Sequence, residues 1–200
     1  MQIKSFVDLT NFGFKELKYG VNRFRMRWSV KNRYLCSAIM EMARVMKQTT
    51  QCFIDDGQRY LMLHRTKKQN DENRDKWIAV GGKFEDGESP EECMLREVLE
   101  ETGYTVTKWQ YRGIVTFVSD IWPAEQMHVF VCTRWTGQER VCDEGDLAWV
   151  DKTKLNELPM WEGDKLFIGL LANDIPFFSL KLTYKGEVLC EAKLNGEKLL

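Results

Sequence analysis

Three glutamates, Glu97, Glu100 and Glu101, stand at positions i, i+3 and i+4 within the stretch REVLEETGY, residues 96–104. In a helix this spacing brings all three side chains onto one face. Like charges so placed repel, and each pair destabilises an exposed helix by roughly a few tenths of a kcal/mol. The stretch therefore predicts a helix whose acidic face is unfavourable alone and becomes favourable when a cation binds it.

The residues on either side supply the signals that begin and end such a helix. Ser89 can accept a hydrogen bond at the N-cap, Pro90 suits the first helical position, and Glu92 completes a capping box. Gly103 is suited to the left-handed position that follows a helix. The pattern predicts a helix over residues 88–103, entered from a glycine-bearing loop, GGKFEDGE.

Residues 82–104 resemble the Nudix box, G-x5-E-x7-R-E-U-x-E-E-x-G-U, where U is an aliphatic residue. All seven fixed positions match, and they are Gly82, Glu88, Arg96, Glu97, Glu100, Glu101 and Gly103. Tyr104 stands at the last U position and is a mild departure. Seven fixed residues at fixed spacing form a far more specific signal than a solitary glycine motif.

The resemblance implies a divalent metal site, with Mg²⁺ as the expected ion and Mn²⁺ as the alternative. Hard divalent cations prefer carboxylate and carbonyl oxygens. The implied ligands are Glu97, Glu100, Glu101 and the carbonyl oxygen of Gly81 or Gly82. Three further residues of the box region are given roles: Arg96 would orient the acids, Glu88 would brace Arg96 or simply begin the helix, and Lys83 would bind substrate.

The wider chain, over roughly residues 46–195, looks like the MutT-type subgroup that hydrolyses oxidised purine nucleoside triphosphates. In the segment MWEGD the resemblance gives Trp161 the role of stacking on the base and Asp164 that of binding its edge. Trp161 could instead pack the core. The resemblance implies that Glu144 is either an additional metal-site residue or the general base, and Asp143 and Asp146 are the alternatives to it.

Two positions depart from this subgroup. Ile78 stands where the eukaryotic relative has an asparagine that contacts the base, and Val80 replaces the proline common before the glycine pair. An apolar side chain cannot make the asparagine's contact, so the base preference could differ or depend on backbone groups. His64 and His128 lie in strand-like runs and are interpreted as structural.

Apolar alternation predicts a series of strands around two helices. A hairpin is expected over residues 49–65 around Asp56-Gly57, followed by strands at 77–80, 113–119, 127–135 and 147–151. A second helix is expected at 162–174, followed by a hairpin over 177–194. The expected fold class is α/β, the Nudix fold, with a mixed β-sheet sandwiched between helices.

Charge divides the chain into two regions. Residues 1–45 hold nine Lys/Arg and three Asp/Glu, a net charge of +6, whereas residues 46–200 carry −7. The first region is interpreted as a basic N-terminal extension and the second as the hydrolase domain. Phe24, Met26, Trp28 and Val30 alternate with polar residues, so the extension could contain a strand. The favoured interpretation of residues 1–45 is an accessory segment or an unphysiological upstream extension, and nucleic-acid binding by these residues is the alternative.

The composition points to a cytoplasmic protein. No apolar run approaches the ~20 residues of a membrane span. Six cysteines occur without a CxxC pair and only two histidines are present, which argues against a zinc site. Most of these cysteines have apolar neighbours and are expected to be small buried residues in a reducing compartment.

The resulting hypothesis is a Mg²⁺-dependent hydrolase of the 8-oxo-dGTP diphosphatase type, which acts on a nucleotide substrate and forms a nucleoside monophosphate and pyrophosphate. Either Glu97 or Glu144 would act on the attacking water. The alternatives are a Nudix hydrolase for an undamaged nucleoside triphosphate, dihydroneopterin triphosphate or a nucleotide sugar. A nucleotide- or RNA-binding module is another, against which the intact set of box acids argues.

Removal of residues 1–45 tests the division of the chain. All candidate site residues lie downstream, so a variant that begins at Met46 should fold and hydrolyse nucleotides within about three-fold of the full chain. The measurements are turnover and thermal melting of both chains. A large loss of turnover on truncation would place the domain boundary elsewhere.

Overall fold

The computed structural model describes residues 15–19, 22–26, 46–67 and 71–200. Contacts divide the chain into two units, Met1–Val45 and Met46–Leu200, and each is described by itself. In the first unit, β1 (Lys15–Tyr19) pairs antiparallel with β2 (Asn22–Met26). The alternation predicted for a strand includes Phe24 and Met26 of β2, while Trp28 and Val30 lie outside the described residues.

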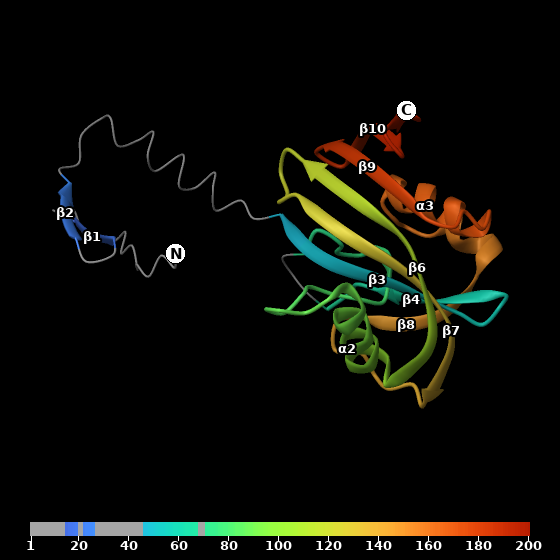
Figure 1. Ribbon diagram of the computed structural model, residues 1–200. Coiled ribbons are helices and arrows are strands. Elements are labelled where there is room, and N and C mark those ends of the chain that lie inside the picture. Colours follow the sequence, from blue (N-terminus) through green and yellow to red (C-terminus); the bar gives the residue numbers. More distant parts are fainter. Residues whose placement is uncertain (1–14, 20–21, 27–45, 68–70) are drawn as a thin grey trace. The chain divides into compact units, whose positions relative to one another are not determined.

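The second unit is organised around a mixed sheet (Figure 1). Its strands run in the order β11-β10-β9-β6-β7-β3-β4-β5, and β8 pairs with β4. The pairs β3–β7 and β6–β9 are parallel, and the other pairs are antiparallel. The bounds are β3 Lys47–Asp55, β4 Arg59–His64, β5 Trp77–Ala79, β6 Tyr104–Ser119, β7 Glu125–Gly137, β8 Asp146–Asp151, β9 Phe178–Lys185, β10 Val188–Leu194 and β11 Glu197–Lys198.

Two helices cover opposite faces of the sheet, α2 (Pro90–Thr102) and α3 (Glu162–Ala172) (Figure 1). Side chains alternate along a strand, so neighbouring residues of β3 join different cores. Cys52 packs in the cluster that contains Val98 of α2, and Phe53 packs in the cluster that contains Phe167 of α3. The predicted α/β fold with a mixed sheet between helices is therefore confirmed. No helix in the described segments is long and apolar enough to cross a membrane.

Both predicted hairpins form, the first as β3–β4 and the second as β9–β10. The main difference from expectation is β6, which begins at Tyr104 and not at Gly113. Residues 107–110 are exposed and lack the alternation that marks a half-buried strand, so the sequence pattern did not reveal them. A short 3-10 helix, η1 (Lys152–Glu157), was also not expected.

Four of the described cysteines, at positions 52, 93, 132 and 142, are buried as predicted, whereas Cys190 is exposed. Cys190 lies where the pairing of β10 with β9 shifts register between Leu189 and Glu191. Such an irregularity changes which side chains of a strand face the core. Cys36 lies outside the described residues.

The start and end of α2 confirm the predicted caps. The Ser89 hydroxyl accepts a hydrogen bond from the Glu92 amide at 3.2 Å, and the Ser89 amide donates to the Glu92 carboxylate at 2.8 Å. Gly103 ends the helix with φ 77°, in the left-handed region that glycine tolerates best. The helix that carries the acidic face is thus fixed at both ends by local sequence.

Ser89→Ala should destabilise the protein by about 1 kcal/mol, because one amide at the helix start loses its acceptor. For a domain of this size the melting temperature should fall by about 2–4 °C. Ser179→Ala is the matched control, since the Ser179 side chain is exposed and its hydroxyl makes no hydrogen bond to a described residue. Equal shifts in the two variants would show that the cap contributes nothing.

Candidate active site

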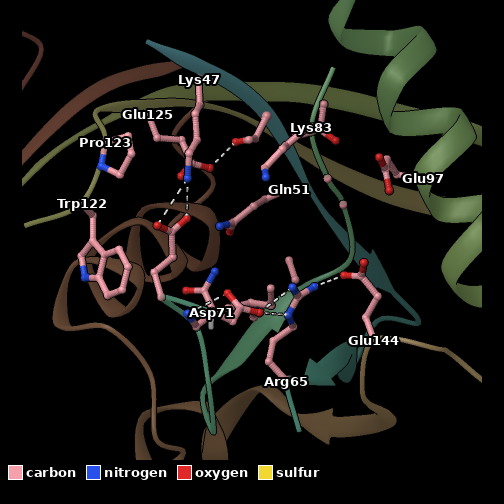
Figure 2. A pocket seen from close by; sticks show the side chains of 18 residues that line it. Lys47, Gln51, Arg65, Asp71, Lys83, Glu97, Trp122, Pro123, Glu125 and Glu144 are labelled. Carbon is pink, nitrogen blue, oxygen red and sulfur yellow. Dashed lines mark hydrogen bonds and ion pairs between the residues drawn. The ribbon is translucent and has the colours of Figure 1, made fainter. Parts of the chain in front are cut away.

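A cavity of about 480 Å³ opens between β3, the glycine loop before α2 and the turn that joins β6 to β7 (Figure 2). Its lining is mostly polar and charged. The lining residues are Lys47, Thr49, Thr50, Gln51, Arg65, Asp71, Glu72, Asn73, Ile78, Ala79, Gly81, Gly82, Lys83, Glu97, Trp122, Pro123, Glu125 and Glu144. Its size suits a ligand of nucleotide dimensions.

The glycine pair lies in contact with both β3 and α2. The Thr50 amide donates to the Gly82 carbonyl at 2.8 Å, so the loop is hydrogen-bonded to β3. A Cβ on Gly81 would lie 2.1 Å from the Thr50 carbonyl oxygen, and one on Gly82 would lie 2.4 Å from the Glu97 carboxylate. Both distances are far below van der Waals contact, so only glycine permits this approach.

Arg96 holds the box acids together. Its guanidinium donates to both Glu88 oxygens at 2.7 and 2.9 Å, to Glu97 at 2.7 Å, and more weakly to Glu100 at 3.3 Å. A further bond of 3.0 Å to the Lys83 carbonyl ties the loop to the helix. These hydrogen bonds from Arg96 lower the pKa of Glu88 to about 2.

Glu101 is buried directly behind the glycine loop. One carboxylate oxygen accepts from the Gly81 amide at 2.9 Å, and the other is buried with no hydrogen-bond partner among the described residues. Burial, together with the charges of Glu144 and Glu97, raises the pKa of Glu101 to about 8. An unpaired buried carboxylate oxygen is unfavourable, and a bound cation would satisfy it.

Glu97 and Glu144 reach the cavity from different elements. Burial is the main cause of the raised pKa of Glu97, and the charges of Glu100 and Glu144 add to it. Glu144 contacts the guanidinium of Arg65, which also pairs with Asp71 at 2.6 Å. Arg65, which follows β4, was not identified from the sequence, and it holds Glu144 at the edge of the cavity (Figure 2).

The predicted metal-binding residues are therefore distributed around the loop. Glu97, Gly82 and Glu144 line the cavity, Glu101 lies behind Gly81, and the Glu100 side chain is 58% exposed beside Arg96. The described His, Cys, Asp and Glu side chains nowhere form a finished three-residue metal site. A bound ion would have to draw these carboxylates toward one point, and its positive charge would offset their mutual repulsion.

The two residues predicted to bind the base lie at a small recess of about 40 Å³. Trp161 is only 7% exposed, and its indole N–H donates to Asn73 at 2.9 Å. Asp164 is buried, and burial together with the charge of Glu125 raises its pKa to about 7. Gln51, Asn73 and Glu125 line both this recess and the main cavity, so the two spaces are neighbours.

The remaining candidates are divided between the cavity and its surroundings. Lys83 and Ile78 line the cavity, whereas Asp143 and Asp146, the rivals of Glu144, do not. His64 stacks on Trp77 at 4.7 Å between ring centroids. His128 bonds to Gln48 at 2.9 Å and to the Tyr111 hydroxyl. Neither histidine lines the cavity, as the structural interpretation predicted.

Several cavity residues were missed because nothing in the sequence marks them as a motif. One usable signal existed on β3, where Lys47, Thr49 and Gln51 alternate on the face that carries Phe53. Polar residues on a strand face that continues into the core indicate a lined cavity. Glu125 and Trp122 carried no comparable signal, since only the pairing of β7 with β3 brings their turn beside Lys47.

A family model described as the NUDIX domain matches residues 47–171. Among curated proteins, the chain is 33% identical over 124 residues to an uncharacterised Nudix hydrolase, YvcI of Bacillus subtilis, covering 60% of this chain and 75% of that protein. It is 32% identical over 122 residues to the oxidised purine nucleoside triphosphate hydrolase of Danio rerio, covering 60% of this chain and 78% of that protein.

A similar solved structure is that of a MutT protein from Bacillus halodurans. It superposes with a TM-score of 0.67 at 28% identity and covers 76% of this chain and 99% of that one. The MutT protein of Methanosarcina mazei, with a TM-score of 0.57 and 24% identity, covers 64% of this chain and 94% of that one, and it supports the fold alone.

Glu97→Gln should reduce turnover by about 10²–10⁴-fold, because it removes a carboxylate that reaches the cavity while nearly keeping its shape. The fold should hold, since the amide oxygen can still accept from Arg96. Steady-state kinetics with Mg²⁺, together with thermal melting, checks both statements. Glu91→Gln is the matched control on the same helix, away from the cavity lining. Near-normal turnover in folded Glu97→Gln would remove Glu97 from the active site.

Asp164→Asn should stabilise the protein more at pH 8 than at pH 4.5. The pKa of Asp164 is about 7 in the fold and 3.8 without it, so the folded chain loses stability as the pH rises between these values. An asparagine does not ionise and escapes this loss. Melting temperatures at both pH values check this, with Asp75→Asn as control because that side chain is 74% exposed. A shift independent of pH would contradict the prediction.

Proposed function

The chain belongs to the NUDIX domain family and is a Nudix pyrophosphohydrolase, and we propose that its substrate is an oxidised purine nucleoside triphosphate. The observation that carries the proposal is the cavity itself, where Glu97 and Glu144 lie at one end and Trp122 at the other (Figure 2). A triphosphate with a planar base matches that arrangement. The Danio rerio relative acts on oxidised purine nucleoside triphosphates, which supports this substrate class.

The residues at the acidic end fit a divalent cation. The donor set is all oxygen, the second oxygen of Glu101 is buried without a partner, and Glu97 approaches Gly82 closely. Glu97, Glu101 and Glu144, with Glu100 nearby, would hold Mg²⁺ or Mn²⁺. The Gly82 carbonyl already accepts from Thr50, so the Gly81 carbonyl is an additional candidate ligand. When bound, the ion offsets charge on the phosphates and polarises the bond that is hydrolysed.

The side chains around the cavity then divide the work of binding and proton transfer. Lys83, which lines the cavity, would bind the phosphates by charge. Glu97 or Glu144 would orient the attacking water and accept its proton. Either carboxylate reaches the cavity, and the raised pKa of Glu97 strengthens it as a base. Arg96 keeps Glu97 in place through its 2.7 Å hydrogen bond.

The reaction adds water across the phosphoanhydride between the first and second phosphates. The products are a nucleoside monophosphate and pyrophosphate, and the water proton passes to the carboxylate. Recognition of the base is assigned to the recess beside the cavity, where Asp164 would bind the base edge. A site built around hydrogen bonds to the base discriminates strongly, because a wrong base leaves buried polar groups unpaired.

Chromatography of monophosphate products from a panel of substrates tests the proposal. The panel comprises 8-oxo-dGTP, dGTP, dATP, dihydroneopterin triphosphate and a nucleotide sugar, each with Mg²⁺. We expect kcat/KM for 8-oxo-dGTP to exceed that for dGTP by about ten-fold or more. A higher kcat/KM for another member of the panel would replace this substrate, and no turnover of any member would remove the triphosphate class.

Asp164→Asn provides the matching variant within the same panel. Exchanging a carboxylate for an amide at the recess should shrink the ratio of kcat/KM between 8-oxo-dGTP and dGTP. Glu162→Gln is the control, since Glu162 lies in the first turn of the same helix with its side chain 65% exposed. An unchanged ratio of kcat/KM between the two substrates in Asp164→Asn would show that another residue recognises the base.

A further inference from the structure

Trp122 is the one aromatic side chain among the described residues that line the main cavity. It lies in the turn between β6 and β7, followed by Pro123. The amides of Ile121 and Trp122 donate to the Ser119 hydroxyl at 3.2 and 3.3 Å, which fixes the backbone of this turn. The ring is half-buried and packs against the core beneath α3.

The surroundings of this ring differ from those of Trp161. Trp161 contacts Phe117 and Tyr184 edge to face, and the Lys76 ammonium covers its ring at 4.4 Å. Its indole N–H is paired with Asn73. Trp122 makes no ring contact with the described aromatic or cationic side chains, and its buried indole N–H finds no acceptor among them. Of the two, Trp122 is therefore the one whose side chain lines the main cavity and is not already engaged by another described aromatic or cationic side chain.

Trp122 also lies across the cavity from Glu97 (Figure 2). Figure 2 shows Trp122 and Pro123 on one side of the cavity and Glu97 on the other, with Gln51 between. Phosphates bound near Glu97 would leave the base directed toward the indole. In a cavity lined mostly by polar and charged side chains, an aromatic ring offers a planar base a stacking contact that those groups do not supply.

Resting on the function proposed above, we propose that Trp122 stacks against the base of the bound nucleotide. This contact would be largely independent of the identity of the base, because every base has a flat π-face. Trp122 would then contribute to the affinity for any nucleotide, while the recess at Asp164 would select among the bases. Trp161, in contrast, forms the buried floor that positions Asp164 and Asn73.

Calorimetric binding of reaction products separates stacking from phosphate binding. The probes are 8-oxo-dGMP, the four unmodified deoxynucleoside monophosphates, and 2-deoxyribose 5-phosphate, which lacks a base. In Trp122→Ala we expect Kd for the tightest nucleotide to rise by about ten-fold or more, with Kd for the sugar phosphate unchanged. Trp122→Phe, which keeps a flat ring, should stay within about three-fold of the native chain.

Trp109→Ala is the matched control, since Trp109 is 37% exposed and does not line the cavity. Thermal melting establishes that each variant is folded, and Trp122→Leu replaces Trp122→Ala if the latter is not. An equal Kd for nucleotide in the native and ring-free variants, or native binding of nucleotides no tighter than of the sugar phosphate, would overturn the inference. Failure of 8-oxo-dGTP turnover alone would overturn only the proposed substrate, because the binding comparison covers every base.

Discussion

Repulsion among the carboxylates of α2 is the constraint on which the rest of the site depends, because neighbouring groups must compensate for it. Glu97, Glu100 and Glu101 share one face, and nothing in their own spacing stabilises that arrangement. Arg96 supplies the compensating charge, with hydrogen bonds to Glu88, Glu97 and Glu100. Burial is the main cause of the raised pKa of Glu101, the charges of Glu144 and Glu97 add to it, and a divalent cation would offset both effects.

The glycine loop is shaped by the need to reach these acids from the sheet. Gly82 must pass within side-chain contact of Glu97, and Gly81 must donate its amide to Glu101 while lying against Thr50. A side chain at Gly81 would collide with the backbone of β3 at Thr50, and one at Gly82 would displace the Glu97 carboxylate. The glycine loop therefore joins β3 to α2 through backbone contacts. These contacts fix the position of the charged helix face relative to the cavity.

The cavity combines segments that are far apart in the chain. Parallel pairing of β3 with β7 places Glu125 beside Thr49, which donates to it at 2.6 Å, and the turn before β7 brings Trp122 to the cavity wall. Arg65 draws Glu144 toward the loop from the opposite side. Glu97 and Glu144 lie on one side of the cavity and Trp122 lies on the other (Figure 2), an asymmetry that would favour one orientation of a bound nucleotide.

The sequence by itself determined the elements that depend on neighbouring residues. Ser89, Glu92 and Gly103 define α2 through contacts that span at most four residues, and the box spacing identifies the acids on its face. Both hairpins follow from turn residues and alternation. Such features are predictable because the interactions that fix them are local in the chain.

Only the tertiary structure decided which side chains meet in the cavity. Arg65, Lys47, Glu125 and Trp122 come from separate segments, and their proximity results from sheet order, which no short pattern encodes. The sequence also could not show which of Trp122 and Trp161 is buried, because the two side chains are chemically identical. Burial of Trp161 beneath α3 and exposure of the Trp122 ring to the cavity follow from packing between distant strands, because long-range contacts, unlike caps and turns, depend on the whole fold.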